Sequence, residues 1–257
     1  MESLCPILER MPVITLEQMK EVQLLNRMDQ KYLLNRSQLT DLLHVVENEY
    51  YVQRIAGDAL APYKTLYFDT VDLAMYTAHH NKKLHRQKLR VRCYRSTQTT
   101  FFEIKNKDNK GKTRKKRIPI DASLFEDCLN VQEVRDFLKT NSPYALSALL
   151  PQVENSFRRI TLVDKAKTER VTIDSEIRFV NRQKGTSFDL SPLVVMEVKH
   201  EVGAPASAVE QALRCLRVQP NRMSKYCIGT VLTNADAKRN RFKPKIRNIH
   251  EIIATSL

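Results

Sequence analysis

Three runs of alternating polar and apolar residues follow one another between residues 85 and 120, and they restrict the fold of this chain more than any other feature. The runs are HRQKLRVRCYR (85–95), TTFFEIKNK (99–107) and KTRKKRIPI (112–120). Because successive strand residues point to opposite sides, this alternation predicts strands with one apolar face. The turn residues KDNKG separate the last two runs, so we expect antiparallel pairing through short connections.

The rest of the chain adds further strands and several helices. Strand patterns occur at 28–34, 63–70, 152–163, 168–180 and 189–200, and helical patterns at 12–26, 37–48, 72–80, 121–150, 206–217 and from 224 onward. Ser37 is the expected N-cap of its helix, with a buried stripe formed by Leu39, Leu42, Leu43 and Val46. The buried positions expected in 121–150 are Leu124, Cys128, Val131, Val134, Phe137 and Leu138. The sequence therefore predicts an α+β fold with a dominant antiparallel sheet.

Each strand pattern has one apolar face and one face rich in Lys, Arg and Glu. In the run at 85–95, Lys88, Arg90 and Arg92 share a face, with Leu89 and Val91 opposite. The strand at 168–180 has a face that is polar throughout, formed by Arg170, Thr172, Asp174, Glu176 and Arg178. The charged faces of the other strands contain Glu103, Lys105, Lys107, Lys115, Arg117, Arg159, Glu197 and Lys199.

A solvated outer surface would explain any one of these faces, but two features of the set favour an interior. Glu197 and Lys199 follow the apolar stretch PLVVM, which is typical of a buried strand, and the charges are mostly positive. A closed barrel accommodates both features, because its apolar faces pack outward against helices and its interior forms a polar tunnel. Neighbouring cations repel one another, so we expect the tunnel to hold a polyanion such as a chain of phosphates.

The composition agrees with an anionic partner and excludes some ways of binding it. The net charge is +14, from 43 basic and 29 acidic residues, which attracts polyanions. The chain has five Gly and neither of the motifs G-x-G-x-x-G and G-x-x-x-x-G-K-[ST], so no glycine-rich backbone loop cradles the phosphates. We expect a cytoplasmic protein with five free thiols and no membrane span, because there is no C-x-x-C pair, signal-peptide pattern or long apolar run.

A series of short motifs adds a more specific indication. They are D-x-K-Y at 29–32, YFDT at 67–70, KLRVRCY at 88–94, FEIK at 102–105, KKR at 115–117, FRR at 157–159, RVTID at 170–174, MEVK at 196–199 and RMSKY at 222–226. In order and spacing they resemble the VTC domain of polyphosphate polymerases, within the triphosphate tunnel metalloenzyme (CYTH-like) superfamily. The resemblance covers about residues 27–235.

The resemblance implies an eight-stranded antiparallel β-barrel tunnel with flanking helices. It divides the chain into a helical lead-in at 1–26, a tunnel domain at 27–235 with a helical insertion at about 121–150, and a basic, exposed tail at 236–257. The implied activity is transfer of the γ-phosphoryl group of ATP onto inorganic polyphosphate, with positioning and charge neutralisation in place of a protein nucleophile. ATP and polyphosphate would be the partners.

The resemblance also assigns roles to individual residues. The implied catalytic cations are Lys31, Arg90, Arg92, Lys105, Arg159, Arg170 and Lys225. Further phosphate ligands would be Lys115, Arg117, Lys199, Arg222 and Ser224. Glu197 would bind Mn²⁺ or Mg²⁺, because carboxylate oxygens suit these ions. Glu103 and Asp174 either add metal ligands or orient the basic residues.

Two positions depart from the family pattern. Hydrolytic tunnel enzymes open with E-x-E-x-K, but Arg27 stands at the first acidic position, which should weaken a second metal site and the activation of water. Phe157 replaces a Tyr and so lacks its hydroxyl group.

Three other readings remain open. The first is a triphosphate hydrolase acting on inorganic, nucleoside or RNA 5′-triphosphates, and the second is a catalytically silent relative that only binds the polymer. The third is a non-enzymatic polyanion-binding module. Nucleic acid is not the expected partner, since the strands place cations beside acids and show no interleaved aromatic motif.

Overall fold

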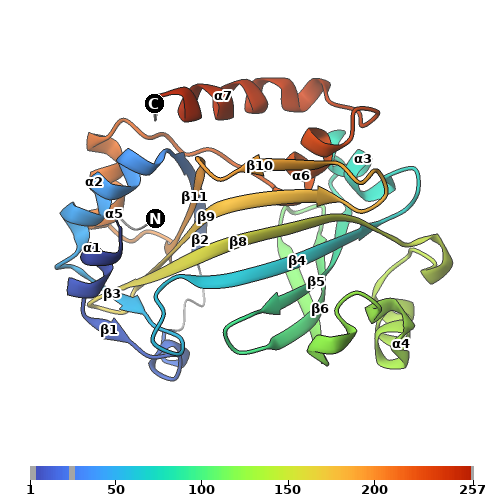
Figure 1. Ribbon diagram of the computed structural model, residues 1–257, viewed down its shortest axis with the longest axis horizontal. Helices are drawn as coiled ribbons and strands as arrows, with labels where there is room; N and C mark the ends of the chain where they lie inside the picture. Colours follow the sequence, from blue (N-terminus) through green and yellow to red (C-terminus); the bar gives the residue numbers. More distant parts are fainter. Residues whose placement is uncertain (1–3, 23–26, 256–257) are drawn as a thin grey trace.

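The fold is built on one antiparallel sheet whose eight main strands follow the order β2-β11-β9-β8-β4-β5-β6-β7 (Figure 1). This computed structural model describes residues 4–22 and 27–255. The main strands are β2 (Arg27–Leu34), β4 (Ala61–Asp69), β5 (Arg86–Tyr94), β6 (Thr99–Lys107), β7 (Thr113–Ile120), β8 (Leu150–Asp164), β9 (Glu169–Asn181) and β11 (Val194–Glu201). Three short strands join the sheet at its margins: β1 (Val13–Ile14), β3 (Tyr50–Gln53) and β10 (Ser187–Leu190).

The sheet is curled, which confirms the predicted class and the eight antiparallel strands of the tunnel fold. Five strand spacings separate β11 from β6, or about 24 Å in a flat sheet. Nevertheless, the charges of Glu197 on β11 and Lys31 on β2 act on the pKa of Lys105 on β6. Within the described chain, the edge strands β2 and β7 do not pair with each other. The sheet is therefore a curled half-barrel, with an inner face that carries the charged residues and an outer face that packs against helices.

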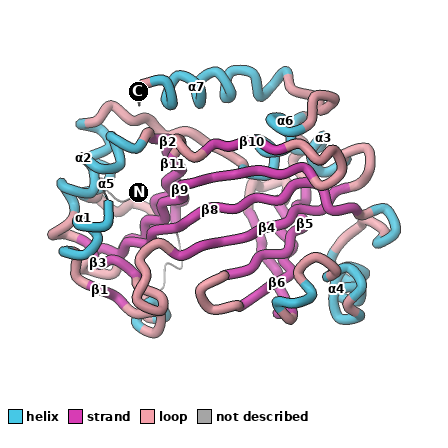
Figure 2. The backbone as a smooth tube through the Cα atoms, viewed as in Figure 1, coloured by secondary structure: helices cyan, strands magenta, loops and turns pink. Residues whose placement is uncertain are grey.

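Helices α1 (Cys5–Arg10), α2 (Arg36–Val46) and α5 (Ala208–Cys215) cover one half of the outer face. They gather at one end of the molecule in Figure 2. The predicted stripe of α2 is confirmed, since Leu39, Leu42, Leu43 and Val46 are all fully buried. The predicted cap is wrong by two residues: Asn35 accepts a hydrogen bond from the backbone N–H of Gln38, and the Gln38 side chain accepts one from the backbone N–H of Asn35. This reciprocal capping box satisfies two donors at the helix start.

The segment between β7 and β8 covers the other half of the outer face. It contains α4 (Gln132–Asn141) and three short 3₁₀ turns, η3 (Ala122–Leu124), η4 (Cys128–Asn130) and η5 (Leu146–Ala148), rather than one long helix. Cys128, Val134 and Leu138 pack against the sheet together with Phe102 and Ile104, as their spacing predicts. Leu124 is wrong as a core residue because the 3₁₀ turn leaves it 39% exposed and buries Phe125 instead.

Helix α6 (Lys225–Thr233) lies on the inner face, where no helix was expected. Its residues Tyr226 and Ile228 share a core cluster with Tyr67, Phe157 and Phe179, which come from strands β4, β8 and β9. The approach is close: a Cβ atom on Gly229 would lie 2.5 Å from the Phe179 ring and 2.9 Å from Val153. The inner face is therefore apolar where α6 packs and charged beyond its N-terminus.

The C-terminal segment is more ordered than an exposed tail. It contains η6 (Asn240–Phe242) and α7 (Lys243–Ala254), which runs along one side of the molecule in Figure 1. Phe242 and Ile249 are buried in the core cluster of α6. The expectation of an exposed tail was wrong for the side of α7 that carries Ile246, Ile249 and Ile253, which packs against this cluster. The basic residues between these isoleucines hide their helical spacing in the sequence.

A bulge in β9 changes which side chains reach the inner face. Glu176 has a φ of +51°, and the register with β8 shifts so that two residues of β9 lie opposite Phe157. A bulge of this kind reverses the alternation beyond it. Arg170, Thr172 and Asp174 keep the predicted face, but Glu176 pairs with Arg158 and Arg178 with Asp189 on the outer side. The prediction of one polar face along the whole strand was therefore wrong.

The predicted N-terminal helix is also corrected. The helix lies earlier, at α1, and 13–14 form β1, which pairs in parallel with β3. A short 3₁₀ turn, η2 (Gln18–Lys20), follows, and the remaining part of the predicted helix, 23–26, lies outside the described residues. Helix α3 (Ala74–His80) connects β4 to β5. Among the described residues, no helix has both the length and the apolar character needed to cross a bilayer.

Candidate functional site

The inner face carries almost all of the charged residues singled out in the sequence, because their register places them side by side. Lys31 lies opposite Glu197 across β2 and β11, and Arg170 lies opposite Lys199 across β9 and β11. The remaining cross-strand sets on this face are Arg159 with Asp174, Arg90 with Glu103 and Arg117, and Lys88 with Lys105 and Lys115. Three carboxylates in this surface each organise a group of cations.

Glu197 is held between two lysines at the β2–β11 edge of the face. Its Oε1 lies 2.6 Å from Lys31 Nζ, and its Oε2 lies 2.6 Å from Lys199 Nζ. Burial alone would raise the pKa of Glu197, but the two ammonium groups outweigh it and hold the pKa well below the usual range. Glu197 is therefore ionised at neutral pH and keeps both lysines on the inner face.

Asp174 joins the sheet to α6 in the middle of the face. Arg159 donates two hydrogen bonds to it, from Nε to Oδ1 at 2.6 Å and from a terminal nitrogen to Oδ2 at 2.8 Å. Lys225, the first residue of α6, donates to Oδ2 as well. Burial opposes ionisation, but both cations hold the pKa of Asp174 well below its usual range. A bidentate Arg–carboxylate pair of this kind fixes the guanidinium plane.

Glu103 organises the third group on β5, β6 and β7. Its side chain is 1% exposed, and it accepts from Arg90 Nε at 2.7 Å and from Lys115 at 3.3 Å. Burial would raise its pKa, but Arg90, Arg92 and Lys115 lower it to about 2. Arg90 also donates to the hydroxyl of Tyr67 at 3.4 Å. The network holds Arg90 rigidly on the inner face.

Arg92 and Lys105 are among the cations of the face for which the described part of the chain supplies no ion pair with a carboxylate. Arg92 donates to Thr65 Oγ1 at 3.1 Å and is 8% exposed. Lys105 lies on the inner face opposite Lys88, and its side chain is exposed at the surface. The protein atoms around it nevertheless reduce the hydration of its ammonium group. This desolvation and the charges of Arg90 and Lys88 lower the pKa of Lys105 to about 8. Cations that lack a protein counterion are suited to bind an anion from solution.

Aromatic rings form the floor of the central group. Phe157 and Tyr63 stack with centroids 5.1 Å apart. The Arg159 guanidinium lies 4.9 Å from the Tyr63 centroid, and the Lys225 ammonium lies 4.7 Å from that of Phe157. Both distances are typical of cation–π contacts. Phe157, which departs from the family pattern, therefore supports cations through its ring face, for which no hydroxyl is needed.

The start of α6 brings in a residue that the sequence analysis had not assigned to the site. Ser224 caps the helix by accepting the backbone N–H of Cys227, and Lys88 Nζ donates to Ser224 Oγ at 2.8 Å. Lys88 shares the parity of Arg90 and Arg92, so its alternation in KLRVRCYR was the signal for its inclusion. Lys88 from β5 and Lys225 from α6 are thus both placed at the N-terminus of α6, on the inner face.

Some predicted residues lie further from these three groups. Arg222 is exposed, and its charge acts on Lys107 and Lys245. Arg117 lies on the edge strand β7 opposite Glu103, but its guanidinium lies over the Phe101 ring, 4.2 Å from the centroid. The inference drawn from Arg27 concerns a side chain outside the described part of the structure.

The acidic residues fit a divalent ion that also binds phosphate, but not an ion held by protein alone. In the described chain, no group of three or more His, Cys, Asp or Glu side chains could hold a metal. Glu103, Asp174 and Glu197 lie in separate groups, each contacted by two cations. Mg²⁺ and Mn²⁺ are often bound by one or two carboxylates with phosphate oxygens and waters as the remaining ligands. Glu197, which is partly exposed, suits that arrangement.

Comparisons with known proteins identify a matching family and solved structures to which the chain is similar. The sequence pattern of the VTC domain matches residues 26–234. Among solved structures, a candidate adenylate cyclase from Bacillus halodurans is 14% identical, with a TM-score of 0.51 over 85% of this chain and 97% of that one. A candidate adenylyl cyclase from Hippeastrum, described as having a dominant triphosphatase activity, is 13% identical, with a TM-score of 0.49 over 80% and 97%. The search of curated proteins found no match.

Proposed function

Since the chain belongs to the VTC domain family, we propose that it is a polyphosphate polymerase that transfers the γ-phosphoryl group of ATP onto a growing chain of inorganic polyphosphate. The observation that carries the proposal is the single inner face on which Arg90, Arg92, Lys105, Arg159 and Lys225 converge from four elements. Cys93, Cys128, Cys215 and Cys227 form no disulfide bond in the described chain, which supports a reducing compartment such as the cytoplasm.

The arrangement suits phosphoryl transfer because the reaction depends on positioning and on neutralising spread negative charge. Arg90 and Arg159 are locked by carboxylates, so they would present fixed donors to phosphate oxygens. The charges of Arg90 and Glu197 both act on Lys105, and the ammonium group of Lys105 would bind the phosphate chain itself. These residues require little rearrangement when the anion arrives.

A divalent ion, Mn²⁺ or Mg²⁺, would be held by Glu197, with Asp174 and Glu103 acting mainly to orient cations. When bound, such an ion would neutralise charge on the phosphate oxygens. Lys31 and Lys199, now paired with Glu197, would then be available to contact the same phosphate groups.

Hydrolysis of triphosphates is the alternative within the same site. A hydrolase needs a group that accepts a proton from water. Glu103, Asp174 and Glu197 all have lowered pKa values because cations surround them, which makes them weak bases. This feature favours transfer to a phosphate acceptor over transfer to water.

The test is to incubate the purified protein with ATP and Mn²⁺ or Mg²⁺, and to resolve the products on a gel stained for polyphosphate. A polymer ladder with ADP is the expected result. Free phosphate without a ladder would identify a hydrolase, and binding of polyphosphate without turnover would identify a binding module or silent relative.

Two variants separate the proposed roles. Glu197→Gln should abolish metal-dependent turnover and retain polyphosphate binding, because it removes a carboxylate but no cation. Arg90→Ala should weaken both binding and turnover. Full activity in either variant would contradict the assignment of that residue.

A further inference from the structure

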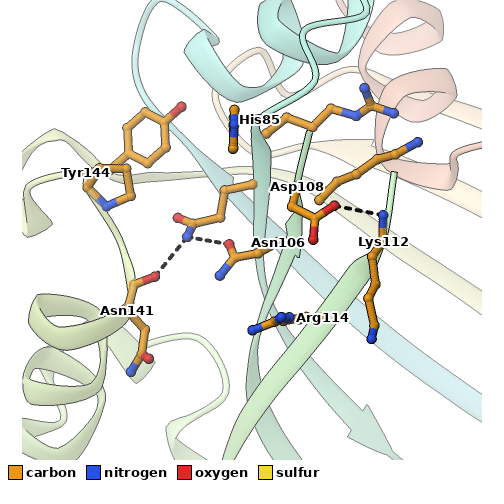
Figure 3. Close-up of a pocket in the computed structure, with 11 residues that line it drawn as sticks. His85, Asn106, Asp108, Lys112, Arg114, Asn141 and Tyr144 are labelled. Carbon is orange, nitrogen blue, oxygen red and sulfur yellow. Dashed lines mark hydrogen bonds between the residues drawn. The ribbon is translucent and has the colours of Figure 1, made fainter. Parts of the chain in front are cut away.

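A second cationic cleft lies beyond the end of the inner face. It has a volume of about 570 Å³ and is lined by the ends of β5 and β6, the turn into β7 and the segment after α4. Figure 3 shows Asn141 and Tyr144 on one side of the cleft and Asp108, Lys112 and Arg114 on the other. None of the three carboxylates of the proposed active site lines it.

The cleft adjoins the row of cations on the inner face at the strand ends, and Gln87, Asn106 and Arg114, which have the opposite parity, extend it toward the face that α4 covers. Arg86 and Lys107 are cross-strand partners, one step along the ladder from the pair Lys88 and Lys105. Both Arg86 and Lys107 line the cleft. Side chains at alternate positions of a strand share a face, so an anion could pass from Lys105 to Lys107 without leaving positive surroundings.

Charge dominates the lining of the cleft. Arg86, Lys107, Lys112 and Arg114 line it, with Asp108 as the one carboxylate. Asp108 is already engaged, since its Oδ1 accepts the backbone N–H of Lys112 at 2.9 Å. The backbone of 108–112 is closed by two further hydrogen bonds, with Gly111 at a φ of +78°. These hydrogen bonds fix the backbone at Lys112, from which its exposed side chain extends.

The floor of the cleft is polar, but the amide group of Gln87 and the amide oxygen of Asn106 are already paired. Gln87, 7% exposed, donates to Asn106 Oδ1 at 2.6 Å and to the Asn141 carbonyl at 2.9 Å. It also accepts from Ser142 Oγ at 2.6 Å. A nucleobase is recognised through free amide donors and acceptors, whereas a phosphate chain needs only cations. The pairing of Gln87, together with the excess of cations, therefore favours phosphates.

We infer that this cleft is a second binding site for the phosphate chain, which holds the part of a long polyphosphate that extends past the inner face. The inference rests on the proposed function and adds a chain-length dependence to it. Arg86 lies four residues from Arg90 along β5, a distance of about 14 Å. A triphosphate bound at Arg90 is shorter than this, so only longer chains would occupy both sites.

The experiment compares the binding of tripolyphosphate with that of a long-chain polyphosphate. The variant combines Lys112→Ala with Arg114→Ala, which removes exposed side chains only. The matched control combines Lys165→Ala on the β8–β9 turn with Arg214→Ala on α5, which removes the same charge elsewhere. Affinities are measured by calorimetry at several salt concentrations.

We expect the cleft variant to bind the long chain at least about threefold more weakly, because each exposed charge contact contributes modestly. Its affinity for tripolyphosphate should be unchanged, and the salt dependence for the long chain should fall by about one for each lost contact. The control should not discriminate between chain lengths. Equal losses for both ligands, or no loss, would overturn the inference and leave the proposed function intact. Failure of the unmodified protein to bind tripolyphosphate would overturn both.

Discussion

The hydroxyl of Tyr226 on α6 donates a hydrogen bond to the carboxylate of Asp69 at the end of β4. Asp69 is fully buried and also accepts the backbone N–H groups of Met75 and Tyr76 at 2.9 and 2.8 Å. One side chain of the YFDT motif therefore fixes both the start of α3 and the first turn of α6. Because Lys225 precedes Tyr226, this contact also positions a cation of the inner face.

Replacing Tyr226 with Phe tests this contact. The variant keeps the ring, but leaves a buried carboxylate without one of its donors, which should lower the free energy of unfolding by about 2 kcal/mol. Tyr76→Phe is the matched control, because it removes a hydrogen bond to the carbonyl of Lys238 and should cost only about 1 kcal/mol. Urea unfolding followed by circular dichroism measures both, and equal losses would contradict the special role of Asp69.

The close packing of α6 against the sheet predicts that a larger residue at Gly229 will destabilise the protein. Gly229→Ala places a methyl group within 2.5 Å of the Phe179 ring, so the helix or the ring must shift. We expect a loss of about 1–3 kcal/mol in unfolding free energy, the usual cost of overpacking a core. Polyphosphate binding should weaken as well, since Ser224 and Lys225 move with the helix. An unchanged melting temperature would mean that α6 is held less tightly than described.

Substitution of Glu103 should change stability and binding in opposite directions. The pKa of Glu103 falls from 4.5 to about 2 on folding. Its ionisation therefore stabilises the fold above about pH 4.5, and this contribution is lost as the pH falls toward 2. Glu103→Gln should cost about 3 kcal/mol at neutral pH.

The same variant frees Arg90 and Lys115 from a competing anion. Tripolyphosphate should therefore bind it at least as tightly as the unmodified protein, under conditions in which both are folded. Parallel denaturation and calorimetry separate the two effects, and a joint loss of stability and affinity would show that Glu103 serves binding mainly by orienting Arg90.

Lys105 predicts how anion binding depends on pH. Its pKa of about 8 lies below the ordinary 10.5, so the free protein loses this charge as the pH rises above 8. A bound phosphate chain favours the protonated amine, so binding takes up a proton and affinity should fall by up to about tenfold per pH unit between 8 and 10. The lowered pKa of Lys105 also reduces the free energy of unfolding at pH values below 8, where the side chain is charged in both states. This loss of stability disappears as the pH rises from 8 toward 10.5.

Lys105→Arg is the control for this titration, because the guanidinium stays charged throughout the range. Titration of the ligand affects both proteins equally, so the difference between them reports on Lys105. Parallel affinity profiles from pH 7 to 10 would show that Lys105 does not contact the phosphate chain.

Much of the sheet was predictable because its signals are local. Alternation located the main strands and placed Arg90, Glu103, Arg159 and Asp174 on one face, and the 3.6-residue period located the core stripe of α2. The cap at Asn35 could also have been predicted, since Asn35 and Gln38 have the spacing of a capping box. Ser37 is an equally favourable capping residue by type, so the sequence did not decide between them. The ion pairs between strands follow from register once the strand order is known.

The remaining features depend on tertiary context. The sequence near Glu176 contains no glycine or proline that would have predicted the bulge in β9. Helix α6 has small and apolar residues on all sides, which indicates burial but does not identify the face of the sheet that it covers. The apolar side of α7 is interrupted by lysines and arginines, so its docking against Phe242 depends on contacts that only the folded chain supplies.

The bulge at Glu176 gives β9 two phases along one continuous strand. Up to Asp174 the even-numbered side chains serve the charged face, and from Ile177 the odd-numbered ones support α6. The bulge therefore compensates for a change of phase between the two halves of the strand. Deleting its extra residue would restore a regular register with β8 and leave Asp174 and Ile177 on the same face, whereas deleting a residue elsewhere in β9 would move the side chains beyond it to the opposite face. One-residue insertions or deletions in β9 away from the bulge should therefore be far less tolerated than substitutions, or than removal of Glu176, whose ion pair with Arg158 lies on the outer side.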